Sequence, residues 1–207
     1  MPVVPPLSPE AAPDSTRAIY DRIKETIGGG QVSLGFQMMG RVESFLQDSY
    51  MNYRKYIHDG AGKLDAKQRA AIALATSSAM NCHSCVKAHA RDAMDAGWSD
   101  GQVAEILAVT ATCTMYNVFY KFKDLAENAD LAGRSVGLRA HTWQKVSLDQ
   151  TLVELINIVV SNINTCKSCT SGHVEKALQL GLTGDQIDEA LKVSAVMAAF
   201  NTFHRTQ

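Results

Sequence analysis

The sequence predicts an all-α fold made of a tandem duplicated helical repeat. Apolar residues recur at three- and four-residue intervals, which is the period of helices with one buried face. Alternating β-branched residues and the hairpin dipeptide Asn-Gly are missing, so strands are not expected. Residues 64–120 also align with residues 148–204 without a gap, at a constant offset of 84 positions. Self-similarity over this length indicates a duplicated structural unit.

Matches are spread over the whole aligned length and are not confined to one motif. They include Leu64/Leu148, Asp65/Asp149, Ile72/Ile156, Ser77/Ser161, Ala93/Ala177, Gly97/Gly181, Gln102/Gln186, Glu105/Glu189, Leu107/Leu191, Val109/Val193, Asn117/Asn201 and Phe119/Phe203. We therefore divide the chain into an N-terminal arm and helix at residues 1–35, a first repeat at 36–130 and a second repeat at 131–207, which together form one compact unit.

The segment before the duplicated region is expected to hold an arm and two helices. Prolines stiffen the first dozen residues. A helix capped by Asp14 or Ser15 should reach Ile27, because the glycines at 28–30 then interrupt the chain. A long helix is predicted over residues 36–57.

Each repeat is predicted to form three helices. Those of the first repeat lie near residues 65–80, 83–96 and 100–127, with Gly97 before the last. Those of the second repeat are a helix over 150–163 capped by Ser147 or Asp149, a motif helix that stops at Gly181, and a last helix capped by Thr183 or Asp185. The link at 128–147 is polar and should carry one short helix over 136–143.

Composition and charge exclude several classes of partner. The net charge is -1 at pH 7 and no run of Lys or Arg occurs, so the usual electrostatic basis for binding nucleic acid or an anionic membrane is missing. No basic segment followed by an apolar one begins the chain, and no uninterrupted apolar span of about 18 residues follows. We expect a cytoplasmic protein, in which closely spaced cysteines are more often catalytic or metal-binding than structural.

Four of the five cysteines lie in two copies of the motif Cys-x-x-Cys-x-x-x-His. The copies consist of Cys82, Cys85 and His89, and of Cys166, Cys169 and His173. Helical positions i, i+3 and i+7 share a face, so the three side chains of each copy can act together. A first cysteine at the helix N-terminus meets the positive end of the helix dipole, which lowers the thiol pKa. The two sulfurs can then cycle between dithiol and disulfide while the histidine moves protons.

Two other interpretations of the motif stay open. Two thiolates and an imidazole are good zinc ligands, but structural zinc sites usually draw a second ligand pair from a separate segment, and no such pair follows here. The cysteines can also be small core residues, although packing does not explain why one constellation is kept twice. The spacing favours redox chemistry without a metal or other cofactor.

The segment CKSCTSGHVEKALQLGLTGDQIDEALKVSAVMAAFNTF resembles the signature of the AhpD-like, carboxymuconolactone decarboxylase superfamily, and so does CHSCVKAHARDAMDAGWSDGQVAEILAVTATCTMYNVF. The resemblance covers residues 64–120 and 148–204. It implies an all-helical fold of the AhpD-like type that assembles as a homotrimer of two-repeat chains, or as a hexamer of one-repeat chains. Members that keep both cysteines are thiol peroxidases or disulfide reductases, which implies a hydroperoxide or disulfide substrate and a thiol electron donor or peroxiredoxin-type partner protein.

The resemblance also implies roles for the second copy of the motif. Cys169 would attack the peroxide, Cys166 would resolve it as a disulfide, and His173 would share a proton relay with a glutamate on the preceding helix. Glu154 occupies that position, twelve residues before the first cysteine. Its helix is apolar on nearly every side, so we expect a partly desolvated carboxylate with a raised pKa. The other interpretation is a solvated glutamate in the first helical turn.

The first copy departs from this pattern. Ala70 stands where the second repeat has Glu154, so we expect the first copy to be a secondary redox motif without an acid. In both copies a serine, Ser84 or Ser168, stands where the family's peroxidase prototype has a histidine. A hydroxyl can donate a hydrogen bond but cannot act as a general base near pH 7.

The predicted function is that of a cysteine-dependent antioxidant enzyme, an alkyl hydroperoxide or thiol–disulfide reductase of peroxidase type. One alternative is the cofactor-free lyase reaction of carboxymuconolactone decarboxylation, for which paired cysteine motifs have no evident use. Another is a redox-sensing or zinc-holding interaction protein that uses its disulfide as a switch. His204 and Cys113 are interpreted as a helix-end residue and an inert core residue.

Overall fold

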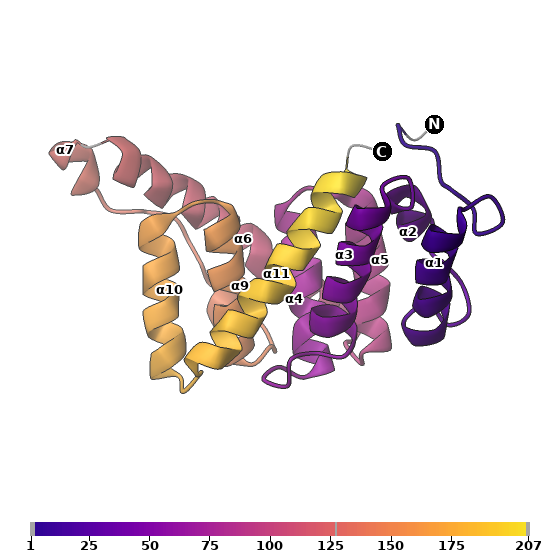
Figure 1. Cartoon of the computed structure of the whole chain (residues 1–207). Helices are drawn as coiled ribbons and strands as arrows, with labels where there is room; N and C mark the ends of the chain where they lie inside the picture. The colour runs from indigo at the N-terminus through magenta and orange to yellow at the C-terminus, as the bar shows by residue number, and fades with distance from the viewer. Residues whose placement is uncertain (1–2, 127, 206–207) are drawn as a thin grey trace.

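The computed structural model of the chain describes residues 3–126 and 128–205, and their regular structure is helical throughout (Figure 1). The predicted all-α class is confirmed. The helices, with one π-helical segment named η1, are α1 (Asp14–Thr26), α2 (Leu34–Met39), α3 (Glu43–Asn52), η1 (Tyr53–His58), α4 (Ala66–Ala79), α5 (His83–Asp95), α6 (Asp100–Ala126), α7 (Ala129–Ala132), α8 (Thr142–Lys145), α9 (Gln150–Ile163), α10 (Lys167–Gln179) and α11 (Gly184–His204).

The third helix of each repeat packs on the other repeat as well as its own, and we call these two helices, α6 and α11, the exchanged helices. In each repeat the first two helices pack together, α4 against α5 and α9 against α10. The third helix of the first repeat, α6, lies along α9 and contacts α10, whereas the third helix of the second repeat, α11, crosses α4 and contacts α5 (Figure 1). A helix from the other repeat therefore borders each cysteine motif.

Matched polar residues hold the exchanged helices in place. Asn117 on α6 donates a hydrogen bond to the Ser161 hydroxyl on α9 (3.0 Å), and Ser77 on α4 donates to the Asn201 side-chain oxygen on α11 (3.2 Å). All four side chains are fully buried. Because buried polar groups need partners, these two pairs favour one register of the exchanged helices over others.

Two aligned glutamates repeat the exchange at the other end of the helices. Glu189 on α11 is 1% exposed and accepts hydrogen bonds from three backbone N–H groups in the segment Ala61–Leu64, just before α4. Glu105 on α6 accepts from the backbone N–H and the hydroxyl of Ser147, just before α9. Each third helix thus binds the loop that begins the first helix of the other repeat.

Local signals set the helix ends largely as predicted. Asp65 and Thr183 form capping boxes that start α4 and α11, and Asp149 caps α9. Gly97 and Gly181 follow α5 and α10 with φ of 96° and 91°. Glycine adopts this left-handed conformation without a steric penalty, which is why the duplicated glycines mark both helix ends.

The N-terminal segment differs from the prediction in two places. No side chain caps α1, because the helix begins after Pro13 and Asp14 is already its first residue. Ser15 instead donates a hydrogen bond to Glu43 at the start of α3. The single helix predicted over residues 36–57 is wrong, since the chain there forms α2, α3 and η1.

Gly40 marks the interruption between α2 and α3. A Cβ atom at Gly40 would lie 1.9 Å from the hydroxyl oxygen of Tyr20, so only glycine allows this approach. Tyr20 is fully buried and donates to the carbonyl oxygens of Leu7 (3.0 Å) and Gln37 (3.3 Å). The tyrosine therefore joins the N-terminal arm, α1 and α2, a long-range contact that helical periodicity does not report.

The short helix predicted over residues 136–143 is also wrong. The link holds two single-turn helices, α7 and α8, with non-helical chain between them. Gly137 has φ of 63°, so a right-handed helix cannot pass through it. Trp143 lies in α8, where its ring packs against Tyr116 of α6 at 5.0 Å between centroids.

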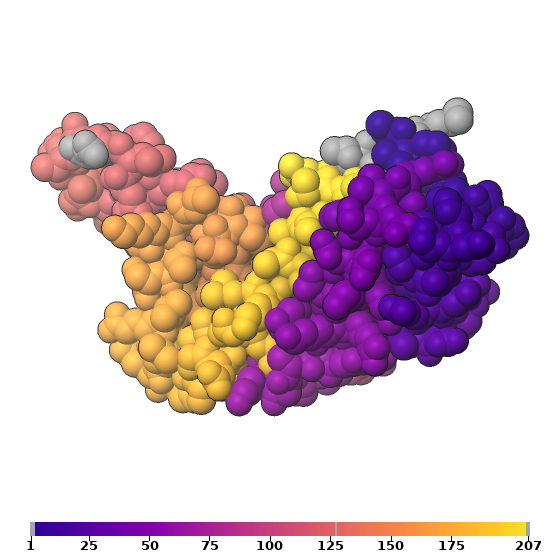
Figure 2. Space-filling view, viewed as in Figure 1, coloured from indigo at the N-terminus to yellow at the C-terminus, as the bar shows by residue number. Residues whose placement is uncertain are grey.

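The end of α6 and the helix α7 project from the body of the molecule (Figure 2). By length and composition α6 is able to cross a membrane, a test that core helices of soluble proteins also pass. In this fold α6 packs along α4 and α9, and Val103, Ile106 and Val109 on its first half are buried.

Candidate active site

Both cysteine pairs lie at a helix N-terminus, as the motif spacing predicts. Cys82 and Cys166 are the N-cap residues of α5 and α10, and each forms a disulfide with the cysteine three residues later. The preceding residues, Asn81 and Thr165, have φ of 56° and 55°. This conformation is rare for β-branched threonine, so tertiary structure must hold the turn. The turn directs the first cysteine of each pair inward, and both are 0% exposed.

Glu154 and His173 meet in the second-repeat site. The Nδ1 atom of His173 lies 2.7 Å from one carboxylate oxygen of Glu154, and the Nζ atom of Lys176 lies 2.7 Å from the other. Glu154 is 1% exposed, so the interpretation as a solvated first-turn glutamate is wrong. The structure therefore brings together the acid on α9 and the histidine on α10 that the sequence singled out.

The expected raised pKa of Glu154 is wrong. Burial alone raises the pKa of this carboxyl, but hydrogen bonds and charge from His173 and Lys176 outweigh burial and lower the pKa below its ordinary value. Lys176 was missed because a lysine on an exposed helix face has no motif signal of its own. Glu154 is consequently an anion at neutral pH.

An ionised Glu154 fixes the tautomer of His173. A carboxylate only accepts hydrogen bonds, so Nδ1 of His173 carries a proton. The other ring nitrogen, Nε2, is then free to exchange a proton with a reacting group. The Trp143 ring packs edge-on against the imidazole at 5.8 Å between centroids, which further fixes the orientation of the histidine.

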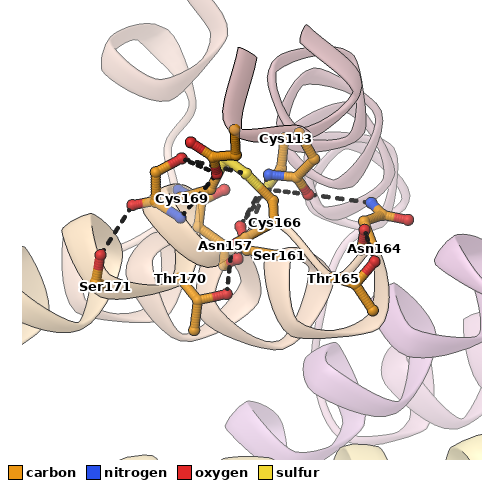
Figure 3. Close-up of a disulfide and its surroundings, with 12 residues drawn as sticks. Cys113, Asn157, Ser161, Asn164, Thr165, Cys166, Cys169, Thr170 and Ser171 are labelled. Carbon is orange, nitrogen blue, oxygen red and sulfur yellow. Dashed lines mark hydrogen bonds between the residues drawn. A yellow bond between two sulfur atoms is a disulfide. The ribbon is translucent and has the colours of Figure 1, made fainter. Parts of the chain in front are cut away.

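The second-repeat disulfide adjoins a buried polar network (Figure 3). The backbone N–H of Cys166 donates to the carbonyl oxygen of Ser161, and the Ser161 hydroxyl lies 3.4 Å from the sulfur of Cys113. Burial raises the pKa of the Cys113 thiol to about 11. This thiol therefore stays protonated and unreactive, in agreement with its interpretation as a core residue.

The serines that replace the family's histidine lie beside the first sulfur of each pair. The Ser168 hydroxyl is 3.8 Å from the sulfur of Cys166 and donates to Asp124 of α6 at 2.8 Å. The Ser84 hydroxyl is 3.7 Å from the sulfur of Cys82. Asp124 anchors Ser168 from the exchanged helix, a contact that sequence spacing does not indicate.

The first-repeat motif has an acid, contrary to the expectation from Ala70. The Nδ1 atom of His89 lies 2.8 Å from a carboxylate oxygen of Asp92, three residues later on α5. The expectation was wrong because it considered only the preceding helix as the source of a carboxylate. Positions three apart on one helix are also neighbours, so the motif helix can supply the acid itself.

A cavity of about 450 Å³ opens beside the first-repeat disulfide. Cys85, His89 and Asp92 line it, together with His204 from the end of α11. Burial, with a smaller contribution from the charge of His89, lowers the pKa of His204. The interpretation of His204 as an ordinary helix-end residue therefore missed a cavity-lining side chain.

A sequence signal for the missed charges does exist. Asp92 and Lys176 occupy aligned positions, and each follows its motif histidine by three residues. At the aligned pair Ala70 and Glu154 the second repeat has the acid, and at the aligned pair Asp92 and Lys176 the first repeat has it. Each repeat therefore has one acid near its histidine, on a different helix. Within residues 3–126 and 128–205, no group of three or more His, Cys, Asp or Glu side chains is arranged to hold a metal ion.

Comparisons with known proteins agree with the duplicated fold. The family model described as the carboxymuconolactone decarboxylase family matches residues 46–126 and 129–205. An alkyl hydroperoxide reductase AhpD of Anaeromyxobacter sp. (strain K) is 31% identical over 138 residues, which are 67% of this chain and 74% of that protein. A protein of the same name from Corynebacterium aurimucosum is 36% identical over 101 residues, 49% of this chain and 56% of that protein.

A solved structure shares the fold. A protein described as a gamma-carboxymuconolactone decarboxylase subunit of Burkholderia xenovorans LB400 superposes with a TM-score of 0.63. The match covers 89% of this chain and 91% of that chain at 18% sequence identity.

Proposed function

The chain belongs to the carboxymuconolactone decarboxylase family, and from this premise we propose that it is an alkyl hydroperoxide or thiol–disulfide reductase working through its second-repeat dithiol. Cys169 is the attacking sulfur, Cys166 the resolving sulfur, and Glu154 with His173 the proton relay. The relatives named alkyl hydroperoxide reductase AhpD support this reaction class. The two cysteine pairs at disulfide distance support a dithiol cycle.

The observation that carries the proposal is the buried pair of Glu154 and His173 beside this dithiol. Cys169 and His173 are four residues apart on α10, so their side chains share one helix face. Burying a carboxylate is costly unless it is paired, and here the partner is an imidazole able to exchange protons. A decarboxylating lyase has no evident use for two disulfide-forming pairs, so the site favours the reductase.

The reaction with a hydroperoxide, ROOH, balances on these groups. The Cys169 thiolate attacks the terminal oxygen, the O–O bond breaks, and the departing alkoxide takes a proton from protonated His173 to give ROH. Cys169 is then a sulfenic acid. The Cys166 thiol attacks its sulfur, water leaves, and the disulfide forms. The dithiol has lost two electrons and the peroxide has gained two.

Thiol–disulfide exchange can reduce the Cys166–Cys169 disulfide back to the dithiol, or let the dithiol reduce a disulfide of another protein. A thiol electron donor or a peroxiredoxin-type partner exchanges electrons with the Cys166–Cys169 disulfide through a mixed disulfide. We place this cycle in the cytoplasm, where thiols are kept reduced. We also propose that the chain works as a homotrimer.

Single-turnover oxidation tests the proposal. After reduction and removal of the reductant, one equivalent of hydrogen peroxide should remove two thiols per chain, and peptide mass mapping should find the Cys166–Cys169 disulfide. Cys169→Ser should abolish most hydrogen peroxide turnover, whereas Cys85→Ser should leave the greater part. Zinc bound stoichiometrically in the same sample, or full retention of thiols, would contradict the proposal.

A further inference from the structure

The acid that contacts the motif histidine comes from a different helix in each repeat. In the second repeat, Glu154 on the preceding helix binds the histidine and needs Lys176 as a second partner. In the first repeat the aligned positions hold Ala70 and Asp92, and Asp92 binds the histidine from the motif helix. Simple decay of the motif would remove the acid without replacing it. Here each repeat instead has one carboxylate in hydrogen-bond contact with Nδ1 of its histidine.

Only one sulfur of the first pair faces the cavity of about 450 Å³. Cys85 lines the cavity beside His89, whereas Cys82 is 0% exposed and is not part of its lining. The rest of the lining is mainly apolar and includes Leu34, Phe36, Met38, Tyr53, Ala88 and Phe200. A molecule in this cavity meets Cys85 directly, with Cys82 positioned behind it through the disulfide spacing.

Two elements outside the duplicated region, α2 and η1, help to build this cavity together with α11. Phe36 of α2 packs edge-on against Tyr53 of η1 at 5.9 Å and against Phe200 of α11 at 5.6 Å, and we call these three rings the aromatic wall. A Cβ atom at Gly35 would lie 2.9 Å from Nε2 of His204, so a glycine lets α2 approach the α11 end closely. Small-molecule sites usually measure about 300–1,000 Å³ and combine apolar walls with few polar groups, as this cavity does.

We propose that Cys82 and Cys85 form a second redox site, with His89 and Asp92 as its proton relay, that reduces organic hydroperoxides carrying an apolar aryl or alkyl group. This inference rests on the proposed dithiol chemistry and adds a second site, with a cavity for the apolar group of the hydroperoxide. The O–O–H end of the substrate lies at Cys85, and its apolar group lies against the aromatic wall. Asp92 is a positioning residue, because it acts through the histidine.

The chemical step balances as in the second repeat. The Cys85 thiolate takes the terminal oxygen of the hydroperoxide, and the O–O bond breaks. The alkoxide takes a proton from protonated His89 and leaves as the alcohol. The Cys82 thiol then attacks the Cys85 sulfenic acid, water leaves and the disulfide forms. A small dithiol such as dithiothreitol can supply the two electrons that close the cycle.

Two double variants separate the sites. Cys166→Ser/Cys169→Ser leaves only the first dithiol, and Cys82→Ser/Cys85→Ser leaves only the second. Each reduced protein is mixed with one equivalent of cumene hydroperoxide or hydrogen peroxide, then quenched over time for thiol counting and disulfide mapping. We expect the protein with the first dithiol to favour cumene hydroperoxide by about 10-fold or more, since burial of an apolar group gives preferences of this size.

Single substitutions in the protein with the first dithiol test the relay. Asp92→Asn should lower the limiting rate of disulfide formation by about 10²-fold without changing the half-saturating peroxide concentration, because it weakens proton transfer and not binding. Asp92→Glu should restore part of the rate. Asp95→Asn, an exposed aspartate on the same helix, is the matched control and should leave the rate unchanged.

A further substitution tests the cavity. Ala88 is an exposed residue at the cavity edge, so Ala88→Trp should fill the opening without disturbing the core. It should raise the half-saturating concentration of cumene hydroperoxide by a much larger factor than that of hydrogen peroxide, which has no apolar group to accommodate. Equal effects on the two peroxides would overturn the assignment of the cavity to the apolar group.

The outcomes distinguish this inference from the proposed function. If the protein with the first dithiol keeps its thiols with both peroxides, or if Asp92→Asn behaves like Asp95→Asn, the inference is overturned. If that protein reacts as expected but the protein with only the second dithiol is inert, the proposed function fails and this inference stands. Far-ultraviolet circular dichroism shows whether each variant is folded.

Discussion

Glu154 is nearly inaccessible to solvent and still has a pKa below its ordinary value, because His173 and Lys176 both bind its carboxylate. Without these partners, burial alone would raise the pKa of this carboxyl. Within the proposed relay, Glu154 therefore stays ionised, and His173 carries the catalytic proton. Glu154 holds the imidazole in the tautomer whose Nε2 can exchange a proton with Cys169 and the substrate.

Glu154→Gln keeps the shape of the side chain and removes its charge. We expect peroxide turnover by the second-repeat dithiol to fall by about 10²-fold, the lower end for general acid–base assistance, because a peroxide already reacts readily with a thiolate. The thiol pKa of Cys169 should rise in parallel. Iodoacetamide reactivity of the reduced protein against pH measures this shift, and superimposable profiles with unchanged turnover would remove Glu154 from the mechanism.

The lowered pKa of Glu154 also predicts how stability depends on pH. The unfolded chain has the ordinary value of 4.5 and binds the proton more tightly than the folded protein. The stabilisation is therefore fully present above that value and is lost as the pH falls through the lower folded-state pKa. Glu154→Gln should cost about 1.5–3 kcal/mol at pH 7 and less at pH 3.

Urea unfolding of the wild type and the variant at pH 7 and pH 3 measures this difference. Glu175→Gln, an exposed glutamate on α10, is the matched control and should change the stability little at either pH. A destabilisation by Glu154→Gln that is the same at both pH values would contradict the ion pairs as its cause.

The site residues could be predicted where the sequence repeat and the family resemblance both indicated them. The spacing and the resemblance predicted the meeting of Glu154 and His173. They did not predict Asp92, Lys176 or His204 at the sites, because each of these is a common charged or helix-end residue. Their importance comes from the side chain that each one contacts.

At the scale of helices, the exchange of α6 and α11 explains why the duplication has kept identical polar residues far from the cysteines. Ser77 and Asn201 form one contact and Ser161 and Asn117 form its counterpart, each pair joining different repeats. A change in either third helix therefore affects the motif of the other repeat. The two sites are built by one shared core.

Glu189 should contribute more to stability than its aligned counterpart, Glu105. Glu189→Ala leaves three backbone N–H groups before α4 without their acceptor, and we expect a loss of about 3 kcal/mol in the free energy of unfolding. Glu105→Ala affects the exposed Ser147 and should cost about 1 kcal/mol or less. Urea unfolding measures both, and equal losses would contradict this account.

Helices with strong periodicity and clear caps were predicted within a few residues of their ends, as α9 illustrates. The errors lie where a tertiary contact decides the path of the chain. The Tyr20 hydroxyl lies so close to Gly40 that the chain bends there between α2 and α3. Gly137, with its positive φ, prevents the helix that was predicted over residues 136–143. These contacts join residues distant in sequence, so a local pattern cannot report them.

At the scale of the whole molecule, α6 presents an apolar stripe that the rest of residues 3–126 and 128–205 leaves exposed. Met115, Val118, Phe122 and Leu125 are 38%, 64%, 55% and 73% exposed and recur at three- and four-residue intervals. A helix face of this kind normally packs against another element. The stripe runs toward the end of α6, which projects from the body, and its exposed side chains are open to a second copy of the chain (Figure 2).

We therefore predict that this stripe is part of the interface of a homotrimer, the assembly that the family resemblance implies. Light scattering at micromolar concentration should give about three times the chain mass of 22.5 kDa. Phe122→Glu places a charge at the centre of the stripe and should shift the mass toward the monomer, because an unpaired buried charge opposes association. Leu178→Glu introduces the same charge at an exposed leucine of α10 and should leave the trimer intact. A monomeric wild-type mass would rule out the assembly, whereas a trimer that survives Phe122→Glu would place the interface on another face.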